Sequence, residues 1–140
     1  MGDADHAPRM IRVSAGLVFQ GGRLLITQRP LDKHLGGLWE FPGGKLEPDE
    51  SFEDCLVREL REELGIEVQV GAMLAAVEHA YPEKQVHIQF YRCCLVSGNP
   101  KPIECADLEW VGAHELDSFV FPPADSGLLA QLKSNPEIWA

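Results

Sequence analysis

A cluster of glutamates on one predicted helix offers the clearest chemistry in the sequence. Glu59, Glu62 and Glu63 are spaced i, i+3 and i+4, so their side chains share one face of a helix. Like charges at this spacing oppose helix formation unless a cation neutralises them. Clustered carboxylate oxygens are the ligands that hard cations such as Mg²⁺ or Mn²⁺ prefer. The alternative is a solvated acidic face, which is common on surface helices.

The segment in front of this helix favours the cation site. Residues 42–45 read Pro-Gly-Gly-Lys, and a glycine pair lets the backbone approach a ligand closely. A carbonyl group from such a turn could complete a metal shell that the glutamates begin. Because Mg²⁺ commonly bridges to substrate phosphates, the pattern predicts chemistry on a phosphoanhydride.

Helix signals place these carboxylates with some precision. Ser51 and Asp54 form a pattern close to a capping box, and Gly65 stands where a helix-ending glycine belongs. One apolar stripe repeats every four residues at Leu56, Leu60 and Leu64. The sequence therefore predicts a helix over 51–64.

The rest of the chain predicts a sheet around this helix. Alternating apolar residues over 11–19 are typical of a strand, and Gln20-Gly21-Gly22 predicts a hairpin turn into 23–28. The remaining expected elements are a long loop at 29–44, strands at 67–77, 86–96 and 107–111, a short helix at 112–119, and a last helix from Asp125 or Ser126 to about Lys133. We expect one α/β domain over 1–140, with a mixed sheet, helices on its faces and a flexible tail at 1–9.

Composition restricts the partners. The 140 residues carry 12 Lys and Arg against 22 Asp and Glu, a net charge of −10, and 45% are hydrophobic. This predicts a globular protein that does not bind nucleic-acid polymers. The longest mostly apolar stretch, 70–77, is too short to span a membrane, and no signal peptide is recognisable. The four cysteines form no CxxC pair, so we expect reduced, buried thiols, a strand with Cys93 and Cys94 on opposite faces, and a cytoplasmic location.

At this point a family resemblance can be stated. Gly44, five residues, Glu50, seven residues and then 58–66, Arg-Glu-Leu-Arg-Glu-Glu-Leu-Gly-Ile, match every defined position of the Nudix box. Weaker similarity from about 12 to 133 resembles the MutT-type branch, through Ile-Thr-Gln-Arg at 26–29, Trp-Glu-Phe-Pro-Gly-Gly-Lys at 39–45 and Phe-Pro-Pro-Ala-Asp at 121–125. The resemblance implies an α/β/α sandwich with a mixed β-sheet between helices.

The resemblance also implies a metal site. Nudix hydrolases cleave a nucleoside diphosphate linked to another group by attack of water at phosphorus, with divalent cations. On this pattern Glu59 and Glu63 are the central metal ligands, Glu62 serves a further metal or its hydration shell, and Gly43 contributes its carbonyl.

Three more residues are assigned around these ligands. Arg58 would orient a glutamate through a charge-assisted hydrogen bond, and Glu50 would steady that arginine as an outer-shell carboxylate. Glu104 lies six residues before Trp110, where MutT-like enzymes carry a glutamate that reaches the metals. The alternative for Glu104 is an exposed loop carboxylate. Either Glu59 or Glu104 could be the general base.

Substrate contacts are expected at Arg29, Phe41 and Asp125. Arg29 resembles a phosphate- or base-contacting arginine, and Phe41 could line the base pocket, although a strand-end surface arginine and a core aromatic are the alternatives. Asp125 stands where MutT-type enzymes acting on oxidised guanine carry asparagine. A carboxylate only accepts hydrogen bonds, so it could pair with the cytosine amine or with N–H groups of an oxidised purine. A helix N-cap is the alternative. His34 is interpreted as a plain loop histidine.

These assignments predict an enzyme. We expect Mg²⁺-dependent hydrolysis of a nucleoside triphosphate to the monophosphate and pyrophosphate, with oxidised and pyrimidine nucleotides among the candidate substrates. The alternative substrates are ADP-ribose, a nucleotide sugar or a dinucleoside polyphosphate. A nucleotide-binding module without turnover is disfavoured, because such domains usually lose glutamates that this chain keeps. The sequence leaves the oligomeric state open.

Overall fold

The computed structural model describes residues 9–139. Strand β1 begins at Arg9, which pairs with Lys84, so the expected tail is one residue too long. Residues 1–8 of that tail lie outside the described part of the chain. No helix within 9–139 is long and apolar enough to cross a membrane.

Seven strands within the described residues form one mixed sheet in the order β3-β2-β1-β6-β5, with β4 paired to β1 and β7 paired to β2. The strands are β1 (Arg9–Gln20), β2 (Arg23–Gln28), β3 (Trp39–Glu40), β4 (Gly43–Lys45), β5 (Glu67–Tyr81), β6 (Lys84–Ser97) and β7 (Asp107–Val111). The pairing of β1 with β6 is parallel, and the other pairings are antiparallel. The expected mixed sheet is therefore confirmed.

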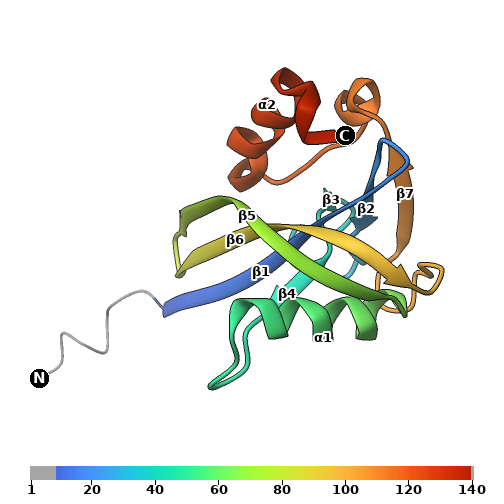
Figure 1. Cartoon of the computed structure of the whole chain (residues 1–140). Coiled ribbons are helices and arrows are strands. Elements are labelled where there is room, and N and C mark those ends of the chain that lie inside the picture. Colours follow the sequence, from blue (N-terminus) through green and yellow to red (C-terminus); the bar gives the residue numbers. More distant parts are fainter. Residues whose placement is uncertain (1–8, 140) are drawn as a thin grey trace, which may run out of the picture.

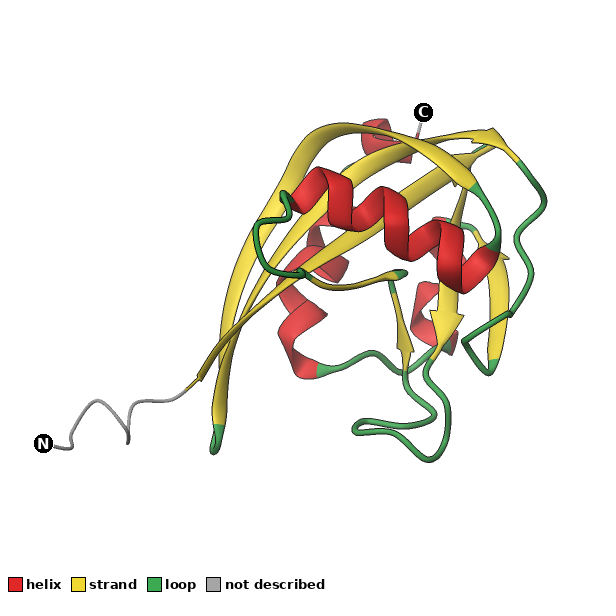
Figure 2. Ribbon diagram, turned by 90° about the horizontal axis from the view of Figure 1, so that it is seen from below, coloured by secondary structure: helices red, strands yellow, loops and turns green. Residues whose placement is uncertain are grey.

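Helices cover both faces of this sheet (Figure 1). Helix α1 (Phe52–Leu64) runs across one face, as the view from below also shows (Figure 2). On the other face, α2 (Ser126–Ser134) packs with the short 3₁₀ helices η2 (Ala113–Ser118), η3 (Pro123–Asp125) and η4 (Pro136–Trp139). This arrangement is the α/β/α sandwich that the sequence predicts.

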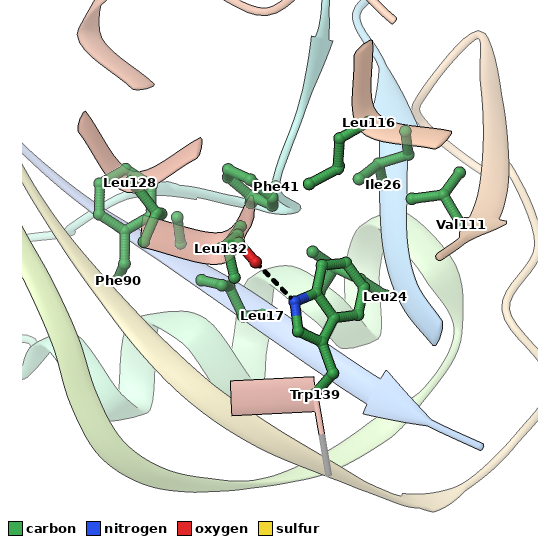
Figure 3. Packing of buried hydrophobic residues seen from close by; sticks show 11 residues of the cluster. Leu17, Leu24, Ile26, Phe41, Phe90, Val111, Leu116, Leu128, Leu132 and Trp139 are labelled. Carbon is green, nitrogen blue, oxygen red and sulfur yellow. Dashed lines mark hydrogen bonds between the residues drawn. The ribbon is translucent and has the colours of Figure 1, made fainter. Parts of the chain in front are cut away.

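Each face of the sheet has its own hydrophobic core. Under α2, a cluster that includes Leu17, Phe90 and Leu132 is closed by Trp139, whose Nε1 donates to the Leu132 carbonyl at 2.9 Å (Figure 3). Under α1, a second cluster joins Val18 to the leucine stripe of the helix. Because β1 lies between the two cores, residues 14–18 are all buried, although the sequence alternates there.

Several element boundaries differ from the sequence prediction. The strands expected at 67–77 and 86–96 extend to 67–81 and 84–97, since each pairs with the other up to the turn at Pro82 and Glu83. The expected loop at 29–44 contains β3 and the start of β4, which pair with β2 and β1. The helix expected at 112–119 is the 3₁₀ turn η2, and η4 follows the last helix.

The cysteines are free, as expected, but they are not all buried. Cys55 and Cys93 are buried, Cys105 is half-buried and Cys94 is exposed. Cys93 and Cys94 therefore differ in exposure as neighbours on opposite faces of β6 should. The expectation of a buried thiol was wrong for Cys94, because its side of the strand is not covered.

Candidate active site

The two ends of α1 fix the position of its acidic face. The Ser51 hydroxyl accepts a hydrogen bond from the Asp54 amide at 3.0 Å and caps the start of the helix. Gly65 adopts a left-handed conformation, φ 69°, and its N–H donates to the Arg61 carbonyl. The buried leucine stripe then determines which face is left for Glu59, Glu62 and Glu63.

Two glycines bring β4 against both β1 and α1. A Cβ atom on Gly44 would lie 2.5 and 2.6 Å from the two carboxylate oxygens of Glu59. A Cβ atom on Gly43 would overlap the Ser14 carbonyl oxygen and lie 2.8 Å from the Ala15 Cα. A side chain at either position would therefore displace the strand or the glutamate.

Strand pairing also orients the Gly43 carbonyl. Gly16 N–H donates to the Pro42 carbonyl at 2.8 Å, and Leu46 N–H donates to the Arg12 carbonyl at 3.0 Å. Hydrogen-bonded pairs alternate along an antiparallel ladder, so Gly43, which faces Ala15, falls at a non-hydrogen-bonded position. Its carbonyl points away from β1 and is available to a ligand.

Arg58 ties the loop, the helix and two glutamates together. Its Nε and Nη2 donate to both carboxylate oxygens of Glu50, at 2.7 and 2.9 Å. Its Nη1 donates to Glu59 at 3.0 Å and to Glu62 at 3.2 Å. The guanidinium and the Glu47 amide lower the pKa of Glu50 to about 2. Glu50 thus holds Arg58, and Arg58 orients Glu59.

Several carboxyl groups crowd together around Glu63. Burial, together with the charges of Glu40, Glu59 and Glu104, raises the pKa of Glu63 to about 9. Burial also raises the pKa of Glu59. In the described structure no three His, Cys, Asp or Glu side chains already converge as a metal shell, and Arg58 occupies one oxygen of Glu59. The donor type and the unbalanced charge fit a divalent cation, which would draw these oxygens together.

Two backbone hydrogen bonds place Glu104 beside these carboxyl groups. The amides of Ile103 and Glu104 both donate to the Glu63 carbonyl, at 3.0 and 3.2 Å. The Glu104 side chain is exposed, yet its charge acts on Glu63. The loop therefore lies at the C-terminal end of the acidic helix, and the assignment of Glu104 to the metals stays a prediction.

A cavity of about 220 Å³ lies on the α2 side of the sheet and takes in all three expected substrate-binding residues, Arg29, Phe41 and Asp125. Phe41 lines the cavity and also belongs to the hydrophobic core. Its ring stacks on that of Phe121, with the ring centroids 5.3 Å apart. His34 also lines the cavity, and its ring meets Tyr81 edge-on at 5.6 Å. His34 is an exposed turn residue, as expected, and its loop folds back over the cavity.

Asp125 is buried in the cavity wall, with 5% of its surface exposed. It precedes α2, but its side chain makes no capping hydrogen bond, so the N-cap alternative fails. Burial and the charge of Glu40 raise its pKa to about 7. The carboxyl group can therefore change protonation state near neutral pH.

Sequence reasoning missed Glu40. It lines the cavity, and its charge also helps to raise the pKa of Glu63. Glu59, Glu63 and Glu104 are called the carboxylate cluster below. The Oε1 of Glu40 accepts a hydrogen bond from Arg29 Nη1 at 3.2 Å. An acidic residue directly before the Phe-Pro-Gly-Gly segment was the available signal, but its side chain could not be placed without the pairing of β3 to β2.

Comparisons with known proteins identify the family of the chain. A model of the NUDIX domain family matches residues 14–131. The chain is 40% identical over 121 residues to CTP pyrophosphohydrolase of Escherichia coli, covering 86% of this chain and 90% of that protein. It is 32% identical over 126 residues to 8-oxo-dGTP diphosphatase of the same species, covering 89% and 98%. The solution structure of the E. coli ORF135 protein superimposes with a TM-score of 0.76 at 38% identity and covers 88% of each chain. The chain therefore belongs to the Nudix family of hydrolases.

Proposed function

We propose that the protein hydrolyses nucleoside triphosphates to the monophosphate and pyrophosphate with Mg²⁺, for which Mn²⁺ can substitute. The observation that carries this proposal is the half-buried pair of glutamates, Glu59 and Glu63, beside the glycine-built backbone of β4. The names of two relatives specify CTP and 8-oxo-dGTP, which supports this substrate class. A cytoplasmic location and the absence of nucleic-acid and membrane partners stay predictions.

The metal-holding residues are assigned from their oxygens. Glu59, Glu63 and the Gly43 carbonyl would hold a cation, with Glu62 and Glu104 serving a further ion or its waters. A bound divalent cation neutralises the polyphosphate and lowers the pKa of water. Without it, the carboxylates and the substrate would repel each other.

The protein's own groups then orient the reaction. Arg58 fixes one oxygen of Glu59 at 3.0 Å, and the Glu59 carboxyl group also contacts the side chain of Glu63. Glu59 and Glu104 both lie close enough to Glu63 for their charges to act on it. They are the two candidates for taking the proton of the attacking water. The pH–rate profiles of Glu59→Gln and Glu104→Gln distinguish them. Only the variant that lacks the general base should lose the fall in rate on the acid side of its profile.

The cavity is the proposed nucleoside site. Phe41 and Phe90 supply an apolar wall, and Asp125 supplies an acceptor for base N–H groups. Arg29 and Lys45 line the same cavity and would offset the substrate's negative charge. An ionised Asp125 suits the amine of cytosine. A protonated Asp125 can also donate, which suits a purine carbonyl.

A nucleotide panel tests the proposal. Purified protein with Mg²⁺ is incubated with CTP, dCTP, 8-oxo-dGTP, the other common triphosphates, ADP-ribose and a dinucleoside polyphosphate. We expect pyrophosphate from at least one triphosphate and a changed order of preference in Asp125→Asn. Release of no pyrophosphate or phosphate from any triphosphate would overturn it. Faster turnover of ADP-ribose or the dinucleotide would favour the alternative substrate class.

A further inference from the structure

Glu40 and Arg29 form an ion pair where the cavity meets the carboxylate cluster. Both residues line the cavity, and the bond from Arg29 Nη1 to Glu40 Oε1 is 3.2 Å long. The side chains are 32% and 25% exposed, so water screens the pair only in part. The negative charge of Glu40 helps to raise the pKa of two carboxyl groups, Asp125 in the cavity and Glu63 in the carboxylate cluster.

Glu40 stands on a rigid support. Strand β3 pairs through Glu40 and Trp39 with Thr27 and Gln28 of β2. The Trp39 amide donates to the Val120 carbonyl at 2.8 Å, and its ring packs edge-on against Phe119 at 4.9 Å. The carboxylate is therefore carried by backbone fixed on two sides.

The backbone of Arg29 is also fixed, by hydrogen bonds with Leu38 and Gly37, and further contacts orient its side chain. Its Nε donates to the His34 carbonyl at 2.8 Å, and its Nη1 donates to Glu40. In the described structure its Nη2 has no hydrogen-bond partner, so its donors remain available at the cavity. A guanidinium held at two nitrogens presents its third in a defined direction.

We propose that Glu40 is a positioning residue that holds Arg29 ready for the nucleotide. Its carboxylate fixes the guanidinium so that the free Nη2 faces the substrate where the cavity meets the carboxylate cluster. Removal of Glu40 releases Arg29 without removing a metal ligand or a group that touches the reacting phosphorus. This inference rests on the proposed function for its substrate, but the orientation of Arg29 is a property of the protein alone.

The orientation can be measured without substrate. In NMR spectra of the full chain, rotation about the Arg29 Nε–Cζ bond, read from the line shapes of its Nη–H groups, should be restrained in wild type and faster in Glu40→Gln, because Nη1 makes the bond to Glu40. Glu109→Gln, which removes an exposed carboxylate on β7, is the matched control and should leave Arg29 unchanged. An equally restrained Arg29 in Glu40→Gln would overturn the proposal, whatever the enzyme hydrolyses.

Kinetics then test whether the orientation matters. With the triphosphate that the panel identifies, Glu40→Gln should raise KM about tenfold and change kcat little. Arg29→Ala should do the same, and the double variant should be no worse than Arg29→Ala alone, because Glu40 acts through Arg29. Glu40→Asp, which keeps the charge, should recover part of the loss. Additive losses in the double variant would contradict the inference, and absence of turnover in wild type would refute the proposed function instead.

Discussion

At the scale of single residues, Asp125 shows how burial changes the chemistry of one carboxyl group. The sequence identifies it as a departure from the MutT pattern, yet an N-cap was an equally good interpretation. Only the packing distinguishes the two, because the side chain turns into the cavity and makes no capping bond. Its neighbours there include Glu40, Tyr81 and Arg29.

Asp125 should make stability depend on pH. Its pKa is raised from 3.8 to about 7, so between about pH 4 and 7 the folded state binds more protons than the unfolded state. The stability that Asp125 contributes is therefore lost as pH rises through that range. Asp125→Asn should be more stable than wild type by about 2–4 kcal/mol at pH 8, and the difference should shrink toward pH 4. Urea unfolding at several pH values measures this, and a pH-independent difference would contradict it.

At the same scale, the Nudix-box residues were predictable and Glu40 was not. The box positions follow from spacing on one helix, and Arg58 indeed contacts Glu50 and Glu59. Glu40 acquires its neighbours through strand pairing and a loop that closes over the cavity. Contacts of that kind join residues far apart in the chain, so no local pattern reports them.

At the scale of elements, α1 shows where sequence patterns succeed. Its cap, its leucine stripe and its terminal glycine all agree, and the helix forms within one residue of the predicted bounds. Strand β4 shows the opposite case. Its sequence, Gly-Gly-Lys, has no strand propensity, and the strand exists because β1 offers a partner and α1 presses close.

Helix α1 should lose stability without its cap. Ser51→Ala removes the acceptor for the Asp54 amide and should lower the free energy of unfolding by about 1 kcal/mol. Ser118→Ala, at an exposed serine for which the described structure shows no side-chain hydrogen bond, is the control. Denaturant titration compares them, and equal effects would mean that the cap carries no energy.

Strand β4 should not tolerate a side chain at Gly44. Gly44→Ala places a methyl group against the Glu59 carboxylate, so Glu59 must move. Activity should fall at least about 100-fold while the protein stays folded, because a displacement of about 1 Å is enough for such a loss. Gly127→Ala in α2, where a Cβ meets nothing within 4 Å, should keep full activity. Initial rates report the activity, and circular dichroism reports the fold. Wild-type activity in Gly44→Ala would contradict a site beside β4.

At the scale of the whole molecule, the negative charge is concentrated at the proposed site. Residues 40–63 contain nine carboxylates against three cationic side chains, which is −6 of the total −10. Composition alone argued against nucleic-acid polymers. The fold shows that much of this charge gathers between α1, β3 and the Glu104 loop, where a divalent cation can relieve it.

Divalent cations should therefore stabilise the folded protein. At saturating MgCl₂ the melting temperature should exceed that in NaCl of equal ionic strength by about 3 °C, since only the folded state assembles the site. EDTA should reverse the gain. Differential scanning calorimetry measures it, and an equal response to both salts would indicate general screening of charge.

The most direct test of the account compares two glutamates of α1. Pyrophosphate release from the preferred triphosphate is measured over a range of Mg²⁺ concentrations for wild type, Glu63→Gln and Glu53→Gln. Glu63→Gln should lose at least about 100-fold in rate and keep its fold, because a metal ligand is removed from a crowded acidic cluster. Glu53→Gln, exposed in the first turn, should match wild type. Wild-type rates and wild-type Mg²⁺ dependence in Glu63→Gln would contradict the account.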